Sequence, residues 1–181
     1  MSHPMSRLHT HQLTLTYGNG PVVESLSLRL PPGRITALIG GNGAGKSTIL
    51  KAVARLLSPK SGAAFLDGKA VHQTPTRELA KQLSILPQSP DAPAGITVWE
   101  LVSYGRFPYR RALGGLSRED RQHVAHAIRT TGLEAMVDRP LSTLSGGQRQ
   151  RAWIAMALAQ DTSVLLLDEP TTYLDVAHQL E

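Results

Sequence analysis

One stretch of the sequence limits the choice of folds more than any other: an apolar run, a glycine-rich turn and a helical pattern follow each other directly. Residues 35–39, ITALI, are almost entirely apolar, as expected of a strand buried on both faces of a sheet. Residues 40–47, GGNGAGKS, fit the pattern G-x-x-x-x-G-K-[ST], and Ile49 and Val53 then begin a helical repeat. This order predicts an α/β domain with a phosphate-binding loop at the N-terminus of a helix.

The residue types of this loop suit a nucleotide. Glycines let the backbone approach the phosphates, a lysine reaches the β- and γ-phosphates, and a serine hydroxyl binds Mg²⁺. The alternative is a glycine turn with a chance lysine, which the flanking strand and helix make the poorer interpretation. The residues expected to bind the nucleotide are Gly40, Gly41, Asn42, Gly43, Ala44, Gly45, Lys46, Ser47 and Thr48, with Ser47 also a metal ligand.

A second apolar run, VLLL at residues 164–167, leads into Asp168 and Glu169. Ligands of open α/β sheets bind at the carboxyl ends of the strands, so this acid pair is expected beside the same nucleotide. Asp168 is predicted to hold Mg²⁺, and Glu169 to polarise the attacking water as catalytic base. Alone, such a pair is more often a turn or a helix cap. Together with the glycine loop, the catalytic interpretation is favoured.

A third signal is LSGGQRQR, residues 144–151, where Ser145, Gly146, Gly147 and Gln148 open a predicted helix. A helix N-terminus of this kind can bind an anion, but the serine is equally a good N-cap and the glycines a plain turn. One nucleotide cannot use two distant glycine cradles unless the second serves a nucleotide held by another subunit.

The rest of the chain predicts further strands and a helical insert. Proline residues interrupt the segment after Ser89, and Ser117 with Asp120 three positions later forms a capping-box pattern before a helix. The other predicted elements are strands within HQLTLTY (11–17), ESLSLRL (24–30), AAFLDG (63–68) and SILPQ (84–88), and a short helix within TRELAKQL (76–83).

Composition excludes some classes of protein. The 181 residues include no cysteine, so disulfides and thiolate metal sites are excluded and a reducing compartment is favoured. The N-terminus is not a secretion signal, and no apolar run reaches the roughly 20 residues that cross a bilayer, so a membrane role would require a partner. A net charge of +5 is compatible with polyanions, but the only basic cluster, RFPYRR (106–111), is small enough to be a solvated face.

The motifs GGNGAGKST, LPQ, LSGGQ and VLLLDEP followed by YLD, in this order and spacing, resemble the ATP-binding subunit of an ABC transporter from about Leu13 to Glu181. The resemblance implies a P-loop NTPase (RecA-like) core with an N-terminal antiparallel β subdomain and a helical insert. It also implies a head-to-tail homodimer that sandwiches two ATP molecules with Mg²⁺. Ser145 and Gly147 of one subunit then meet the γ-phosphate held by Lys46 of the other.

The resemblance assigns roles that the residues alone do not. Tyr17 matches the aromatic residue that stacks on adenine, although a strand tyrosine is by default half-buried packing. Gln88 matches the catalytic-site glutamine that touches Mg²⁺ and links the core to the insert; otherwise it is a loop residue. Asp175 matches an aspartate that signals across the dimer, and otherwise is a helix cap. Trp99 and Trp153 are expected to be packing residues.

Within the family, LSGGQRQRAWIAMALAQ and TVWELVSYGRFPYR are similar to the ATPases of ferric-siderophore importers, with heme and vitamin B12 importers as alternatives. The implied partners are ATP, permease subunits in the cell membrane and, indirectly, a substrate-binding protein, with no nucleic acid. The implied location is the cytoplasmic face of the membrane. A soluble ABC ATPase outside transport, and a nucleotide-binding module without turnover, are the other classes considered.

The resemblance also predicts a division of residues 1–181, taken as one incomplete domain. It places an antiparallel part at 8–30, the ATP-binding core at 34–88 and 144–181, and the helical subdomain at 89–143. Family members continue beyond Glu181 with a strand between 35–39 and 164–167 and a switch histidine; His178 comes too early and is expected to face solvent. We therefore expect a fragment lacking its C-terminal strands, poorly soluble and inactive, with these two segments about 9–10 Å apart.

Overall fold

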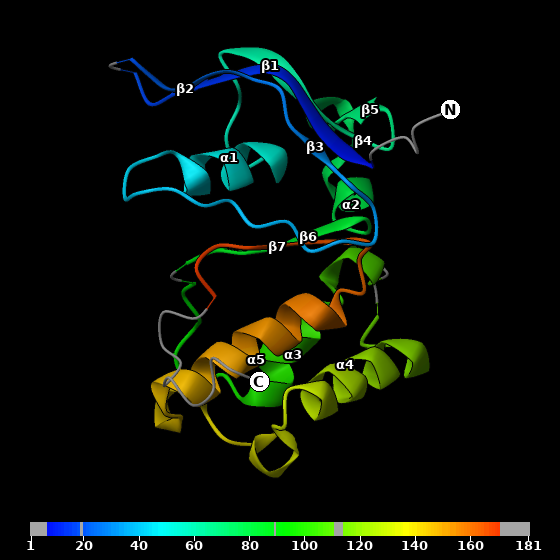
Figure 1. The fold of residues 1–181 in the computed structure, drawn as a ribbon. Helices are drawn as coiled ribbons and strands as arrows, with labels where there is room; N and C mark the ends of the chain where they lie inside the picture. The colour runs from blue at the N-terminus through cyan, green and yellow to red at the C-terminus, as the bar shows by residue number, and fades with distance from the viewer. Residues whose placement is uncertain (1–6, 19, 89, 111–113, 171–181) are drawn as a thin grey trace. The chain divides into compact units, whose positions relative to one another are not determined.

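The computed structural model describes residues 7–18, 20–88, 90–110 and 114–170 (Figure 1). The predicted roles of Asp175 and His178 lie outside the described residues. The chain divides into two compact units, one ending at Leu79 and one beginning at Ala80. Each unit has its own sheet and its own packed helices, so each is described by itself.

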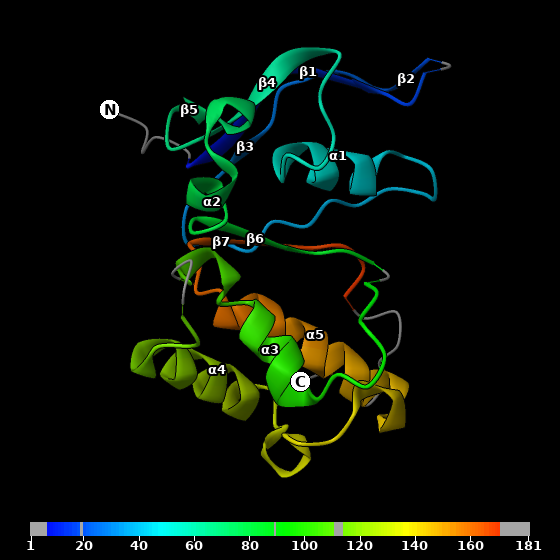
Figure 2. The same ribbon diagram turned by 180° about the vertical axis from the view of Figure 1, so that it is seen from behind.

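The first unit is built around an antiparallel sheet. Its strands are β1 (Leu8–Thr16), β2 (Pro21–Leu26), β3 (Arg29–Leu30), β4 (Ser61–Leu66) and β5 (Lys69–Ala70). The long strand β1 pairs with β2, β3 and β4, and β5 pairs with β4. Leu13 and Leu15 of β1 are fully buried, as the alternating pattern predicts, and they pack with Ala52 of α1 (Lys46–Val53). Figure 2 shows α1 along the β1–β2 hairpin.

Residues 27 and 28 lie outside the strands and divide the second predicted strand, residues 24–30, into the end of β2 and the separate β3. Within β2, Ser25 has a positive φ of 46° at an irregularity in the pairing with β1, and just after β2 the Ser27 hydroxyl accepts a hydrogen bond from the Gln12 amide at 3.0 Å. The predicted helix at 76–83 is shorter in the structure, with α2 covering Thr76–Leu79 after the 3₁₀ turn Val71–Gln73. The antiparallel character of this part is confirmed.

The prediction of a buried strand at residues 35–39 is wrong. This segment forms no strand, and Ile35 and Ile39 are 102% and 95% exposed. An apolar sequence favours burial but does not supply a partner, and no described strand of this unit pairs with the segment to satisfy its backbone groups. The sequence analysis expected a missing strand between two present ones, at residues 35–39 and 164–167. The first of these two strands is not formed.

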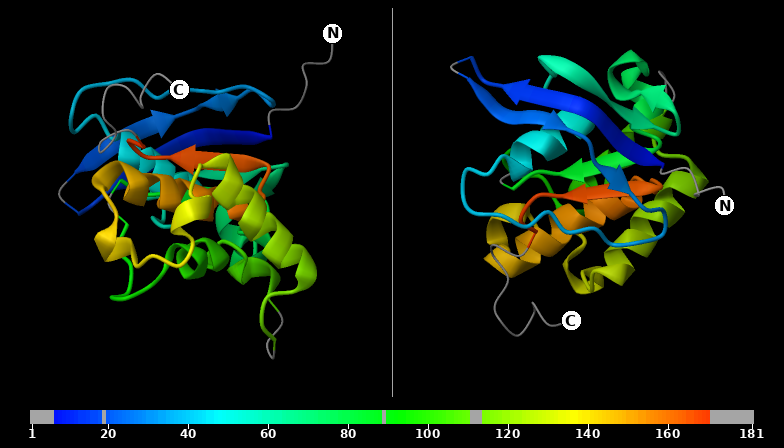
Figure 3. Two further views of the ribbon diagram at one scale, coloured as in Figure 1. Left: turned by 90° about the horizontal axis from the view of Figure 1, so that it is seen from below. Right: turned by 45° about the horizontal axis from the view of Figure 1, so that its top comes forward.

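The second unit contains the parallel pair β6 (Leu83–Leu86) and β7 (Val164–Leu167), which Figure 3 shows side by side. Leu166 of β7 is buried, whereas Leu165 and Leu167 are 36% and 37% exposed. The predicted strand at residues 164–167 is therefore present, but only one of its faces is covered. The acid pair at residues 168 and 169 follows directly after this strand.

The helical part packs around one apolar core. It contains α3 (Val98–Tyr104), α4 (Arg118–Thr130) and α5 (Gly146–Ala159), with 3₁₀ turns at Phe107–Tyr109, Glu134–Met136 and Leu141–Thr143. Its fully buried residues include Val98, Leu101, Val124 and Leu133, and Trp153 packs among them as predicted. None of the helices in the described ranges is long and apolar enough to cross a bilayer.

Reciprocal capping boxes begin all three of these helices. The predicted box at Ser117 and Asp120 is confirmed: the Asp120 amide donates to Ser117 Oγ at 3.0 Å, and the Ser117 amide donates to Asp120 Oδ2 at 3.0 Å. Thr97 caps α3 with Glu100 in the same way. Bonds from the Thr97 amide and hydroxyl lower the pKa of Glu100. The chain therefore fixes where each helix begins by local polar contacts.

The prediction that RFPYRR is a solvated face is wrong for Arg106, which is only 3% exposed. Its Nε donates to Asp120 Oδ1 and its Nη1 to the Ala159 carbonyl, both at 2.9 Å. The guanidinium also lies 3.8 Å from the centre of the Tyr109 ring. The preceding Gly105 lets α3 approach α5, because a Cβ there would lie 2.2 Å from the Met156 carbonyl oxygen. Arg106 therefore joins the end of α3 to α4 and α5.

Candidate functional site

The glycine loop of the first unit turns sharply into α1. Gly43 and Gly45 have φ angles of 79° and 87°, which favour glycine, and the Ala44 amide donates to the Gly41 carbonyl at 3.2 Å. A Cβ at Gly45 would lie 2.8 Å from Cγ2 of Val23, so the loop also packs tightly on β2. The first turn of α1 has no side-chain cap and no acidic residue. This leaves a helix N-terminus suited to an anion.

Lys46, the first residue of α1, extends back over the loop. Its Nζ donates to the carbonyls of Gly40 and Gly41, both at 2.8 Å, and its side chain is half-buried. The ammonium is thus held at the loop by two weak neutral acceptors. A phosphate oxygen would be a stronger, charge-assisted acceptor for the same group.

Other predicted residues of the loop lie in distinct environments. Thr48 is buried in α1, Ser47 is partly buried beside it, and Asn42 is exposed. Tyr17 is 60% exposed, directly after β1, so its ring is not the half-buried packing expected of a strand tyrosine. Thr16 pairs with Pro21 at the end of the hairpin whose Val23 meets the loop. Tyr17 is therefore an exposed aromatic ring at the hairpin end of the same unit.

In the second unit, the acid pair follows β7. Asp168 is 6% exposed, and its amide donates to the Leu86 carbonyl at 3.0 Å, which continues the ladder with β6. Glu169 is exposed with a φ of 49°, a left-handed conformation that is uncommon for a residue with a side chain. Gln88, two residues past β6, donates from Nε2 to Glu169 Oε2 at 2.5 Å. The structure thus brings together two predicted site residues 81 positions apart.

The LSGGQ segment begins α5. Ser145 is the N-cap: its Oγ accepts from the Gln148 amide at 3.2 Å, while Gln148 Oε1 accepts from the Ser145 amide at 3.0 Å. Gly146 and Gly147 form the first turn without side chains. The capping alternative is therefore present in the structure. It does not use the hydroxyl proton of Ser145, which can still be donated to an anion.

Gln150 is a site residue that the sequence reasoning missed. It is 4% exposed on α5, and its Nε2 donates to the Pro170 carbonyl at 2.9 Å, directly after the acid pair. The only sequence signal is its position one turn after Gly146 in a helix. Gln150 ties the helix that begins at Ser145 to the loop that carries Glu169.

The available metal ligands are few. The described residues contain no cluster of three or more histidine, aspartate or glutamate side chains that could hold a metal ion, and the chain has no cysteine. The predicted ligands Ser47, Gln88 and Asp168 supply hard oxygen atoms. Mg²⁺ prefers such ligands and is commonly held by one or two carboxylates together with substrate phosphates. Each of these oxygen ligands, Ser47 in the first unit and Gln88 and Asp168 in the second, is of the type that Mg²⁺ accepts.

The sequence pattern of the ABC transporter family matches residues 23–172. The iron(3+)-hydroxamate import ATP-binding protein FhuC of Bacillus subtilis is 56% identical over 98% of this chain and 66% of its own length. The ferric enterobactin transport ATP-binding protein FepC of Escherichia coli is 45% identical over 100% of this chain and 67% of its own length.

A solved ATP-binding subunit of an ABC transporter superposes with a TM-score of 0.79 at 26% identity, over 96% of this chain and 71% of that one. The chain thus spans about two thirds of the length of the relatives that it matches. The match covers the glycine loop, the acid pair and the LSGGQ segment together. The chain belongs to the ABC transporter family.

Proposed function

We propose that this chain is the ATP-binding and ATP-hydrolysing subunit of an ABC importer for ferric siderophores. The observation that carries the catalytic part is the Gln88 amide held against Glu169 at the end of the strand that also delivers Asp168. The naming of relatives as iron(3+)-hydroxamate and ferric enterobactin import proteins supports the substrate class. Heme and vitamin B12 remain the alternative substrates.

The proposed roles follow from the chemistry of each group. The amides of the loop from Gly40 to Gly45 bind the phosphates, Lys46 turns its ammonium from the loop carbonyls to the β- and γ-phosphates, and Tyr17 stacks on the adenine. Ser47 and Asp168 hold Mg²⁺, which when bound would neutralise charge on the phosphates.

Glu169 accepts a proton from the attacking water. Its strained backbone and its contact with Gln88 fix where the carboxylate lies before ATP arrives. Gln88 can therefore report metal and nucleotide binding to the helical insert that follows it. Ser145 and Gly147 serve the γ-phosphate held by a second copy in a head-to-tail homodimer.

The partners belong to the same proposal. The segment from 95 to 143, above all the surface near Gln88 and residues 97–111, would contact a permease at the cytoplasmic face of the membrane, and a substrate-binding protein would act through that permease. Cross-links from this segment to a co-expressed permease would support the assignment. Cross-links confined to β1 and β2 would refute it.

Two variants of the longest available form of the protein test the nucleotide site. Lys46→Ala should abolish detectable ATP binding, whereas Lys51→Ala, which removes an exposed lysine from the same helix, should not. Glu169→Gln keeps the shape and the acceptor for Gln88 but removes the basicity. ATP should then bind normally while phosphate release falls by about 10² or more.

The matched control for the second variant is Glu134→Gln, an exposed glutamate in the 3₁₀ turn Glu134–Met136. Normal turnover in Glu169→Gln would remove Glu169 from the mechanism. Binding of ATP without turnover in the unmodified protein would favour a nucleotide-binding module. Turnover that no permease influences would favour a soluble ABC ATPase.

A further inference from the structure

The glycine loop contains an asparagine directly followed by a glycine, Asn42 and Gly43. Both residues are exposed, and they occupy the centre of the turn that the bond from the Ala44 amide to the Gly41 carbonyl closes at 3.2 Å. Asparagine is a thermally labile residue, because the backbone nitrogen of the next residue can attack its side-chain amide. A following glycine obstructs this attack least, since it has no Cβ.

The group that would attack is the backbone nitrogen of Gly43. Within the described part of the chain, the Gly43 amide donates no hydrogen bond, and the Asn42 side chain makes none either. A Cβ built on Gly43 would meet no atom within 4 Å, so no packed neighbour restrains this residue. Hydrogen bonds and packing are what hinders such an attack in a folded protein, and this pair of residues has neither.

The surroundings of the pair are positive. Lys46 Nζ donates at 2.8 Å to the carbonyl of Gly41, the residue that precedes Asn42. The pair also lies just before the N-terminus of α1, where the helix dipole is positive, and the first turn of α1 contains no acidic residue. Attack by the nitrogen develops negative charge on the side-chain oxygen, which such a field stabilises. The features that suit this loop to phosphate therefore also favour the attack.

We propose that Asn42 is a site of spontaneous deamidation in the nucleotide-free protein. The Gly43 nitrogen bonds to Cγ of Asn42, and its proton passes through water to Nδ2. The bond from Cγ to Nδ2 breaks, so that ammonia leaves and a cyclic succinimide remains. Water then opens this ring at either carbonyl and gives aspartate or isoaspartate. The net reaction consumes water and releases ammonia, with no oxidant or reductant.

Either product places a carboxylate in a loop that suits an anion. The carboxylate is a charge-assisted acceptor for the Lys46 ammonium, stronger than the neutral carbonyls that now hold it, and its charge repels the phosphates of a nucleotide. Isoaspartate also inserts a methylene group into the main chain of the turn. Modified chains should therefore lose ATP binding. Bound ATP should in turn shield Asn42, an expectation that rests on the proposed function.

Mass spectrometry of tryptic peptides measures the reaction. Cleavage after Arg34 and Lys46 yields residues 35–46, in which Asn42 is the only side-chain amide, so a gain of about 1 Da assigns the site. The longest available form of the protein is incubated without ATP in mildly alkaline buffer, folded or unfolded in guanidinium chloride. Asn42 should react at least as fast in the folded protein. A folded rate below about a tenth of the unfolded rate would mean that the fold protects Asn42, and would overturn the proposal.

ATP should slow the reaction. If only the nucleotide-free form reacts, ATP with Mg²⁺ at about ten times its Kd should reduce the rate about tenfold. Lys46→Ala, whose tryptic peptide extends to Lys51, should lose both ATP binding and this protection. Protein that binds no ATP at all would refute the proposed function, whereas its rate at Asn42 without ATP would still decide the modification. Unprotected Asn42 in protein that does bind ATP would refute the reaction in the free loop.

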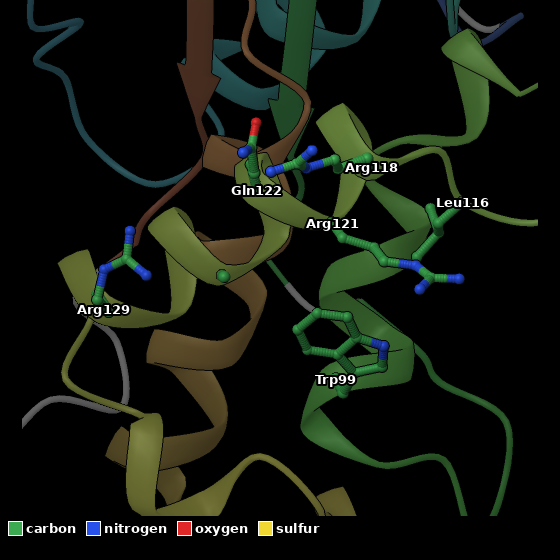
Figure 4. A pocket seen from close by; sticks show the side chains of 7 residues that line it. Trp99, Leu116, Arg118, Arg121, Gln122 and Arg129 are labelled. Atoms are coloured by element: carbon green, nitrogen blue, oxygen red, sulfur yellow. The ribbon is translucent and has the colours of Figure 1, made fainter.

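A charge variant tests the consequence of the modification. Asn42→Asp supplies the charge of the product and should weaken ATP binding at least about tenfold. The matched control is Gln122→Glu, which adds the same charge at an exposed amide on α4, beside the hollow in Figure 4. This control should bind ATP as the unmodified protein does. Undiminished binding in Asn42→Asp would refute the inactivation.

A second variant tests the chemistry of the ring. Asn42→Gln would have to form a larger, less favourable ring, so its ATP binding, whatever its initial strength, should persist through an incubation that inactivates the unmodified protein. An equal loss in both proteins would overturn the proposal. The other asparagine–glycine pair of the chain, at residues 19 and 20, lies in a separate tryptic peptide, residues 8–29. A loss of ATP binding that follows modification at residue 19 instead of 42 would also overturn it.

Discussion

Replacing Arg106 by methionine should destabilise the second unit by about 3–5 kcal/mol, because the change leaves the Asp120 carboxylate buried without its counter-ion. Arg106 and Asp120 are joined at 2.9 Å, with side chains only 4% and 8% exposed. The Ala159 carbonyl loses its donor at 2.9 Å as well, while the methionine side chain retains part of the packing. A loss of this size is a large share of the 5–15 kcal/mol that holds a typical domain folded.

The cause can be separated from simple loss of packing by a second substitution. Asn at position 120 keeps an oxygen for the Ser117 amide but carries no charge, so R106M/D120N should be more stable than R106M by about 1–3 kcal/mol. The matched control is Arg149→Met, which truncates an exposed arginine of α5 and should change the free energy of unfolding by less than about 0.5 kcal/mol.

The pH dependence of the free energy of unfolding is a second test of the role of the Asp120 charge. Burial alone would raise the pKa of Asp120, but the bonds from Ser117 and Arg106 outweigh it and hold that pKa below its ordinary value. Its contribution to stability is therefore present above the ordinary carboxyl pKa and is lost as the pH falls through the lowered value. In R106M the bonds from Ser117 remain but the contribution of Arg106 is lost, so the pKa of Asp120 should rise above its value in the unmodified protein. The stability difference between the two proteins should then shrink from pH 7 to pH 4.

Urea unfolding followed by tryptophan fluorescence measures these differences, since Trp153 lies in the core of the same unit. Two results would refute the reasoning. One is a loss below about 1 kcal/mol in R106M, which would mean that water reaches the pair and screens it. The other is a double variant no more stable than R106M, which would mean that the buried charge is not the cause.

Three further substitutions, two of them each with a matched comparison, test local geometry. Gly105→Ala should destabilise the second unit by about 1–3 kcal/mol, measured by urea unfolding, because its Cβ would lie 2.2 Å from a carbonyl oxygen of α5. Gly62→Ala should lower the melting temperature, because the φ of Gly62 is +73° and a Cβ there would lie 2.1 Å from the backbone of β1. Gly68→Ala should lower it less, because a Cβ at Gly68, where φ is +79°, would meet no atom within 4 Å. Ser145→Ala should reduce amide-exchange protection in the first turn of α5, by about 1 kcal/mol, whereas Ser145→Gly should cost only a few tenths.

The parts of the fold that sequence predicted correctly are those determined by neighbours in the chain. The alternation of Leu13 and Leu15 locates β1, and the box of Ser117 and Asp120 locates the start of α4. Both signals act over two to four residues, so they do not depend on the rest of the molecule. The same is true of the glycine loop, because the positive φ of Gly43 and Gly45 is a local requirement of the turn.

The errors occur where the outcome depends on a distant partner. Residues 35–39 have the composition of a buried strand, yet a strand needs a neighbour, and composition does not say which segment provides it. Arg106 stands in a basic cluster that reads as solvated, but its acceptors lie 14 and 53 positions away on other helices. Family resemblance, rather than local pattern, was needed to pair Gln88 with the acid pair.

The position of α5 explains why the LSGGQ segment and the acid pair can act together within one unit. Near its start, Gln150 donates to the Pro170 carbonyl just after Glu169. At its end, Gln160 Nε2 donates to the Ala80 and Leu83 carbonyls, at the beginning of the strand that leads to Gln88. A single helix therefore contacts both β-strand segments whose far ends meet in the Gln88–Glu169 bond. The helix that begins after Ser145 is therefore tied by the Gln150 bond to the segment that carries Glu169.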